Sequence, residues 1–190
     1  MPEKSVIIVS GLPRSGTSLM MQMLDAGGLE PLTDNIREAD VDNPRGYYEF
    51  EAVKQVANEA TWVAHARGKV VKMVYRLLYD LPAAFRYRVV FMRRNLNEVI
   101  ASQDEMLQRR GKNDSRLTHE QLIQAYRREL GHVEGWLAGQ PNFSVLYVDH
   151  AEALHEPRRL AEKLNEFLGG NLNVEQMARV PDPSLHRQRQ

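Results

Sequence analysis

The sequence predicts an α/β protein with three layers, in which a central parallel sheet of four to five strands is flanked by helices. Four short segments are apolar and rich in β-branched residues, as buried strands are, and long segments with helical spacing separate them. The strand segments are apolar at consecutive positions and not only at alternate ones. This pattern indicates burial on both faces, and therefore helices on both sides of the sheet.

Length and composition agree with a single domain over residues 1–190. The chain is 43% hydrophobic and 26% charged, which is typical of a globular protein and excludes a disordered or fibrous one. Its 25 basic side chains balance 25 acidic ones, so no overall basic field favours nucleic acid or an anionic membrane as a partner. Any binding site for an anion must therefore be a local cluster.

Cysteine and histidine usage excludes several kinds of site. The sequence has no cysteine, and therefore no disulfide, zinc–thiolate site or cysteine nucleophile. Its six histidines are dispersed without the spacing of metal ligands, and we expect no metal. The first apolar run, over 6–9, is too short for a signal peptide or a membrane span. We therefore expect a soluble, cytoplasmic protein without a membrane partner.

The strands and helices have recognisable limits. Asn95 and Glu98 form an N-cap and a partial capping box for a helix that ends at Gly111. Thr118 and Gln121 open the next helix, whose apolar stripe we expect to pack on the sheet. The four predicted strands are 6–10, 70–74, 88–92 and 145–148.

A third helix follows the last strand, and two stretches resist regular structure. Pro157 begins this helix, and Gly169 and Gly170 end it. The stretches 27–46 and 111–117 are rich in polar residues and turn formers, and they predict surface loops. Long loops in compact domains often recognise ligands, so we expect them to contribute to substrate recognition.

The segment directly after the first strand predicts a phosphate-binding loop, and hence a fold of P-loop type. Gly11 and Gly16 bracket this turn between strand and helix. Consecutive N–H groups of such a turn face one concavity, and the helix dipole adds positive potential, so a phosphate or sulfate can bind. A glycine turn at this place also occurs for packing alone. The loop residues that we assign to anion binding are Pro13, Arg14, Ser15, Gly16, Thr17 and Ser18.

The loop differs from that of nucleoside triphosphatases at one position. Its spacing follows Gly-x4-Gly-Lys-Ser/Thr, but Thr17 occupies the lysine position, and the cation is Arg14 instead. The second and third strand segments are followed by basic residues, so neither provides an obvious magnesium-binding aspartate. These differences argue against an ATPase or a kinase. They favour a ligand from which a group is transferred without magnesium.

The loop and a second motif resemble those of sulfotransferases. Residues 13–18 resemble the loop by which this superfamily holds the 5′-phosphosulfate of 3′-phosphoadenosine 5′-phosphosulfate (PAPS). The family binds the 3′-phosphate with an arginine at a strand end and a serine eight residues later, and Arg94 and Ser102 stand in that register. An arginine fork and a helical hydroxyl suit a dianionic phosphate. In the later stretch 145–169, His150 falls where many members have a tyrosine near the adenine.

The resemblance spans residues 5–170 and points to the bacterial and small-molecule branch of the superfamily. It implies an enzyme that moves a sulfuryl group from PAPS to a hydroxyl or amine of a small-molecule acceptor. The protein then mainly positions the groups and stabilises charge. Arg14 is the first candidate cation, and Lys72 is the next, because it matches a family lysine beside the donor.

The resemblance indicates the general base less directly than it indicates the cations. Many animal members use a histidine two residues after the lysine, but here that position is Val74. Some bacterial members use a glutamate that follows the first helix, and Glu49 and Glu51 stand in a comparable place. We prefer Glu49 as the catalytic base, with His65 as a further candidate. Acids at the start of a helix are also favoured by the helix dipole, so Glu49 and Glu51 have a structural interpretation too.

Two other functions stay open. One is a PAPS- or PAP-binding module without turnover (PAP is 3′-phosphoadenosine 5′-phosphate), because Val74 replaces the histidine and no glycine-rich basic loop precedes Gln190 as it often does in the family. The other is a P-loop kinase-like enzyme, against which Thr17 argues.

Overall fold

The computed structural model describes residues 5–34, 46–109, 111 and 117–181 of the chain. Four parallel strands form its centre, in the order β2-β1-β3-β4. Their bounds are β1 (Val6–Gly11), β2 (Val70–Lys72), β3 (Tyr87–Arg93) and β4 (Phe143–Asp149). All four strands predicted from the sequence are confirmed.

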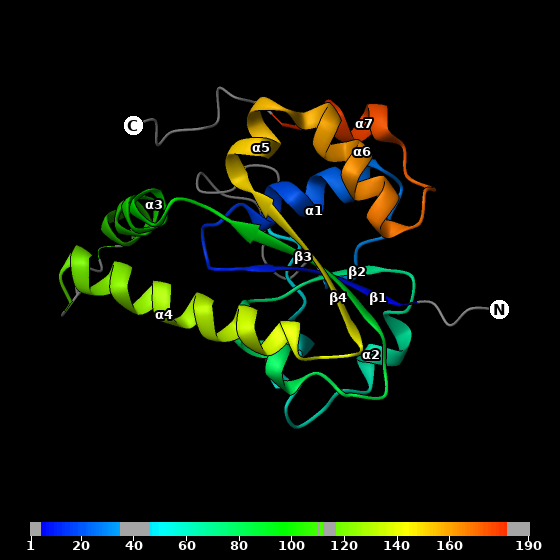
Figure 1. Cartoon of the computed structure of the whole chain (residues 1–190), viewed down its shortest axis with the longest axis horizontal. Coiled ribbons are helices and arrows are strands. Elements are labelled where there is room, and N and C mark those ends of the chain that lie inside the picture. Colours follow the sequence, from blue (N-terminus) through cyan, green and yellow to red (C-terminus); the bar gives the residue numbers. More distant parts are fainter. Residues whose placement is uncertain (1–4, 35–45, 110, 112–116, 182–190) are drawn as a thin grey trace.

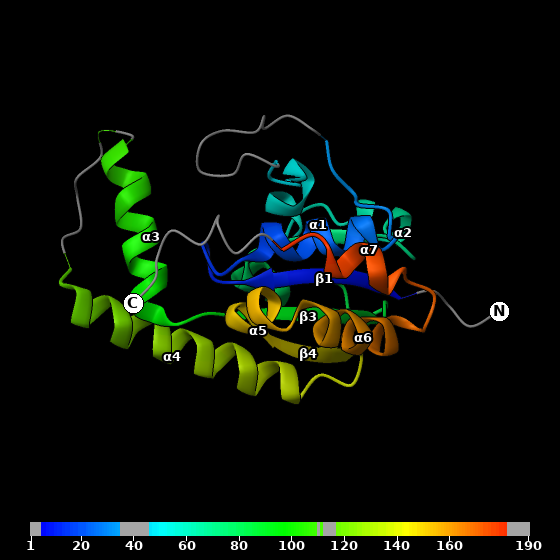
Figure 2. The ribbon, with the colours of Figure 1, turned by 90° about the horizontal axis from the view of Figure 1, so that it is seen from above.

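Helices cover both faces of this sheet, as Figure 1 shows. One face carries α1 (Thr17–Ala26), α5 (His150–His155), α6 (Pro157–Leu168) and α7 (Val174–Ala178). The other carries α2 (Trp62–His65), α4 (His119–Ala138) and the 3₁₀ segments Glu51–Gln55 and Tyr75–Asp80. The helix α3 (Leu96–Arg109) and the first half of α4 extend beyond the end of the sheet (Figure 2). The predicted three-layer α/β fold is therefore confirmed.

The central strand β1 explains the apolar runs in the sequence. All six of its residues are buried. Val6 and Ile8 pack into the hydrophobic cluster on one face, whereas Ile7 and Val9 pack into the cluster on the other. Because successive side chains of a strand point to opposite faces, a strand between two helical layers is apolar at every position.

The predicted helix ends are also found. Thr118 and Gln121 form a complete capping box at the start of α4. The side chain of Asn95 accepts a hydrogen bond from the N–H of Asn97 (2.9 Å) at the start of α3. Gly169, with φ of 112°, ends α6 in the left-handed conformation that favours glycine. Most of the second predicted loop (112–116) and part of the first (35–45) lie outside the described residues.

The sheet order determines where a ligand can bind. β1 pairs with β2 on one side and with β3 on the other, so the chain crosses to the opposite half of the sheet between β2 and β3. Ligands of open parallel sheets bind at the carboxyl ends of the strands, beside such a crossing point. That point is where the loop after β1 meets the end of β3. In the described part of the chain, no helix has the length and apolar character of a membrane span.

Candidate active site

A cavity of about 600 Å³ opens at the carboxyl ends of β1, β2 and β3. Its described lining includes four cationic side chains and one carboxylate, which are Arg14, Lys54, Lys72, Arg94 and Glu49. This local positive charge occurs in a chain whose formal net charge is zero, so the cavity is suited to an anion. Within the described ranges, no group of three or more His, Cys, Asp or Glu side chains can hold a metal ion.

The loop between β1 and α1 depends on two glycines. Gly11 has φ of 148°, and a Cβ atom there would lie 2.7 Å from the carbonyl oxygen of Met92 in β3. Gly16 has φ of 98°, and a Cβ atom there would lie 2.5 Å from the His150 ring. Both positions therefore require a residue without a Cβ atom, which lets the loop pack directly on the chain that follows β4 and on the end of β3.

Two of the predicted site residues face the interior and do not line the cavity. Ser15 is 1% exposed, and its N–H donates to the carbonyl oxygen of Leu12 (3.2 Å), which closes the turn. His150 is buried and packs against Gly16 from behind. A contact of His150 with adenine stays a prediction. The predicted loop residues that do line the cavity are Pro13, Arg14, Gly16, Thr17 and Ser18.

We expect Gly16→Ala to lower the free energy of unfolding by about 2–4 kcal/mol, because it combines backbone strain with a clash. Gly28→Ala is a matched control, since Gly28 has φ of 92° but a Cβ atom there would meet no other atom within 4 Å. It isolates the backbone strain, which amounts to about 1 kcal/mol. Urea unfolding of both variants measures the difference. Equal losses of stability would contradict close packing of the loop on His150.

Arg94 and Ser102 converge on the loop from β3 and α3. Arg14 has φ of 70°. Its Nε donates a hydrogen bond to the Oγ of Ser102 (3.0 Å), a residue 88 positions later in the sequence. Arg94 donates from Nη1 to the carbonyl oxygen of Arg14 (3.1 Å). Ser102 is buried, and the Arg94 side chain is only 10% exposed. The two sequence motifs therefore meet at Arg14, which is held by both its side chain and its backbone.

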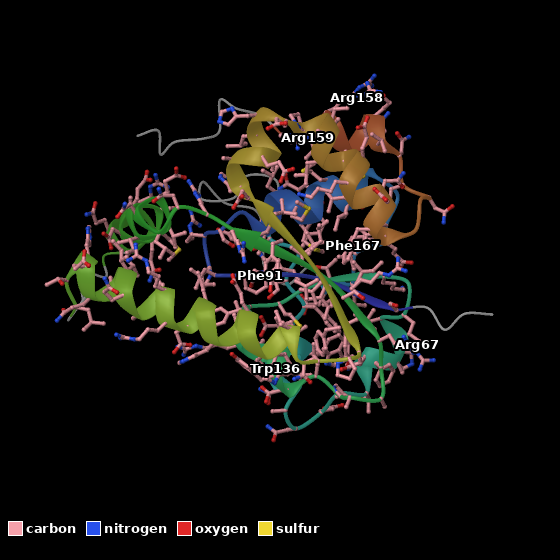
Figure 3. All side chains as sticks on the ribbon, viewed as in Figure 1. Arg67, Phe91, Trp136, Arg158, Arg159 and Phe167 are labelled. Carbon is pink, nitrogen blue, oxygen red and sulfur yellow. The ribbon has the colours of Figure 1, made fainter. Side chains whose placement is uncertain are left out.

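The neighbouring arginine has a different role. Arg93 forms an ion pair with Glu134 of α4 (2.8 Å), and its guanidinium carbon lies 4.0 Å from the centre of the Tyr147 ring. It joins α4 to the sheet and does not line the cavity. Figure 3 shows two further arginines, Arg158 and Arg159, on the outer side of α6. Of the adjacent pair 93–94, only Arg94 reaches the loop.

Lys72 brings an ammonium group to the loop from β2. Its Nζ donates to Ser18 Oγ (3.1 Å) and to the carbonyl oxygen of Tyr47 (2.7 Å). A lysine in the interior is stable only when its charge has such partners. The loop has Thr17 where nucleoside triphosphatases have a lysine, but Lys72 of β2 lies beside the next residue, Ser18.

The structure distinguishes the two candidate carboxylates. Glu49 lines the cavity, and its carbonyl oxygen accepts hydrogen bonds from Thr33 Oγ1 (2.9 Å) and from the N–H of Asp34 (3.3 Å). Glu51 is exposed and pairs with a lysine one helical turn later. His65 is exposed at the end of α2 and does not line the cavity.

Tyr48 anchors the segment that carries Glu49. It has φ of 52°, and its hydroxyl donates to Asp25 Oδ2 (2.8 Å) at the end of α1. Burial, together with the hydrogen bond to Asp25 and the charge of that carboxylate, raises the pKa of Tyr48 to about 12. The phenol therefore stays protonated at neutral pH and acts as a donor, not as a base. No sequence motif marks this anchor, because the contact joins residues 23 positions apart.

The wall of the cavity beyond the loop is largely apolar. Val74 lies there with 44% of its surface exposed, together with Phe50, Leu77, Met106 and Tyr126. Of these five residues, the sequence draws attention only to Val74, through its place two residues after Lys72. The other four come from separate segments of the chain, so no single motif contains them.

Comparisons with known proteins address the family and the fold. Residues 4–183 match the family model described as the sulfotransferase domain. The crystal structure of mouse sulfotransferase SULT7A1 complexed with PAP superposes with a TM-score of 0.55 at 18% sequence identity. The match covers 95% of this chain and 63% of the mouse chain, so this chain spans less than two thirds of that protein's length. At this identity the likeness concerns the fold.

An unliganded sugar kinase from Janibacter sp. HTCC2649 is a more remote structural match. Its TM-score is 0.45 at 15% identity, with 94% of this chain and 99% of the kinase chain covered. This likeness is too weak to bear on function. No curated protein sequence matches this chain.

Proposed function

The chain belongs to the sulfotransferase domain family, and from this premise we propose that it transfers a sulfuryl group from PAPS to a hydroxyl or amine of a small-molecule acceptor. The observation that carries the proposal is the meeting of Arg94 and Ser102 with Arg14 at the cavity. PAPS bears anionic groups at its 3′ and 5′ ends, so it requires two anion sites at a fixed separation. A main-chain loop and an arginine fork are the two kinds of site that suit these groups.

The described lining fits such a donor. Thr17 and Ser18 begin α1, where the first N–H groups have no partner within the helix and face an anion favourably. Lys72 adds a cation beside Ser18. These groups would hold the 5′-phosphosulfate, whereas Arg94 and Ser102 would hold the 3′-phosphate. The cavity volume of about 600 Å³ lies within the range of small-molecule sites.

The proposed chemistry needs one base and several positive groups. When bound, PAPS supplies a sulfuryl group attached to a phosphate leaving group. Glu49 takes the proton of the acceptor hydroxyl while the oxygen of that hydroxyl bonds to sulfur. Lys72, Arg14 and the loop N–H groups stabilise the charge that develops on the phosphate as its bond to sulfur breaks. The apolar wall that includes Val74 and Met106 limits the access of water to the reacting groups.

A PAPS- or PAP-binding module without turnover is the second candidate. The observation that favours it is Val74, which exposes an apolar side chain to the cavity at the position of the family's histidine. It shares the donor site with the first candidate and differs only in the lack of a base. A kinase-like enzyme, in contrast, would require ATP and magnesium.

Titration calorimetry with PAP and with ATP, each with and without Mg²⁺, tests the donor assignment. We expect PAP to bind at least about tenfold more tightly than ATP, because each charge-assisted contact to the 3′-phosphate contributes about 1.5–3 kcal/mol. Magnesium should not be required. Tighter binding of Mg-ATP than of PAP would contradict the proposal and favour the kinase-like function.

An assay of product formation then separates an enzyme from a binding module. The protein is incubated with PAPS and a panel of phenols, alcohols and amines, and PAP and sulfated product are measured together. Transfer to at least one acceptor is the expected result. PAP binding without transfer to any acceptor would favour the module.

A further inference from the structure

Glu98 lies beside the predicted 3′-phosphate site. The sequence indicates a capping-box residue at this position, but in the structure Glu98 Oε2 accepts a hydrogen bond from Arg94 Nε at 2.8 Å. The pair is largely shielded from water, since the Glu98 side chain is 21% exposed and the Arg94 side chain 10%. A fixed negative charge therefore accompanies the cation that would bind the phosphate.

This contact fixes the direction of the arginine fork. Glu98 binds the Nε edge, and the carbonyl oxygen of Arg14 binds Nη1. Within the described residues Nη2 makes no hydrogen bond, and Arg94 lines the cavity. A guanidinium has five N–H donors in a rigid plane, so two fixed contacts orient the donors that remain.

The same carboxylate opposes the binding of an anion. Its charge is weakly screened because it is mostly buried, and it lies within one guanidinium width of any phosphate bound to Arg94. Glu98 therefore has two effects of opposite sign. It orients Arg94, which favours phosphate binding, and it repels the phosphate.

We propose that Glu98 is a positioning residue that orients Arg94 and sets how tightly, and for how long, a 3′-phosphorylated nucleotide is held. This inference rests on the proposed function. The product PAP keeps the 3′-phosphate, so a site without the opposing charge would also release product more slowly. Slow product release limits turnover in many enzymes.

The test separates the charge of Glu98 from its hydrogen bond. PAP and adenosine 5′-phosphate are titrated calorimetrically into the wild type, Glu98→Gln and Glu98→Asp, and PAP dissociation is followed by stopped flow. Glu98→Gln keeps an oxygen for Arg94 Nε but removes the charge, so PAP should bind about tenfold more tightly and dissociate more slowly. Glu98→Asp keeps the charge but is too short for the contact, so PAP binding should weaken. Binding of adenosine 5′-phosphate, which lacks the 3′-phosphate, should change little.

Glu134→Gln is the matched control. It removes the same charge from the partner of the neighbouring Arg93, away from the cavity, and should leave the affinity for PAP unchanged. Circular dichroism confirms that each variant is folded. Should Glu98→Gln not fold, Glu98→Ala also removes the charge and should still bind PAP more tightly than Glu98→Asp does.

The outcomes distinguish this inference from the proposed function. A wild type that binds PAP no more tightly than adenosine 5′-phosphate would contradict the proposed function itself. A wild type that prefers PAP, combined with a Glu98→Gln variant whose PAP affinity is equal or lower, would overturn only the role of Glu98. If Glu98→Ala has to replace Glu98→Gln, its affinity for PAP is compared with that of Glu98→Asp. An affinity of Glu98→Ala that is no higher would also overturn the role of Glu98.

Discussion

Arg94→Ala should weaken PAP binding by about a hundredfold, because it removes charge-assisted hydrogen bonds that together contribute about 2–4 kcal/mol. Binding of adenosine 5′-phosphate should fall by no more than about threefold. This smaller effect comes from the lost hydrogen bond to the carbonyl oxygen of Arg14, which supports the loop. Titration calorimetry at one fixed salt concentration measures both affinities.

Arg93→Ala provides the control for this variant. It removes the same charge one residue earlier, from a side chain that is engaged with Glu134 and Tyr147. PAP affinity should change little in this control, because the charge is outside the cavity. Equal losses for PAP and for adenosine 5′-phosphate in Arg94→Ala would mean that Arg94 supports only the loop. If Arg94→Ala and Arg93→Ala weakened PAP binding equally, the loss would come from the change in net charge and not from a specific contact of Arg94.

Glu49→Gln should lower kcat by at least about a hundredfold, since a general base contributes about 10²–10⁴-fold to a reaction rate. Its affinity for PAP should stay within about twofold of the wild type, because the amide replaces a carboxylate that would act on the acceptor and not on the nucleotide. Product formation at saturating PAPS gives kcat, and calorimetry gives the affinity. Full turnover in this variant would remove Glu49 as the base.

Glu51→Gln is the matched control for Glu49→Gln. Glu51 lies two residues later, is exposed and forms an ion pair with Lys54. An exposed pair of this kind contributes little to stability, so both folding and turnover should be close to wild type. A larger loss of turnover in Glu51→Gln than in Glu49→Gln would reverse the assignment of the two carboxylates.

The sequence predicts well those features that a single segment determines. The continuous apolar run of β1 reflects burial on both faces and needs no knowledge of its neighbours. The turn between Gly11 and Gly16 is equally local, because strand, glycines and helix follow one another in the chain. The assignment of Arg94 and Ser102 depended instead on resemblance to a family and stays a prediction, whereas their contacts with Arg14 are seen in the structure.

Features that depend on contacts between segments were missed or incomplete. Glu98 was assigned to a capping pattern, although its spacing of four residues from Arg94 also fits the ion pair that the structure shows. Ser15 belongs to the loop motif, yet its side chain is buried beside Gly11 and does not line the cavity. His150 also lies behind the loop. Neither the direction of Ser15 nor that of His150 follows from spacing along the chain.

The parallel sheet has a practical consequence for attaching probes. The strands are parallel and the cavity lies at the carboxyl ends of β1, β2 and β3, so the amino ends of all strands lie at the opposite edge of the sheet. Ser144 is exposed at that edge, near the start of β4. It precedes the last residue of that strand by five positions, which corresponds to about 16 Å along an extended chain. The protein contains no cysteine, so Ser144→Cys introduces a unique thiol of nearly the same size. A fluorophore or a surface tether attached there leaves the mouth of the cavity accessible.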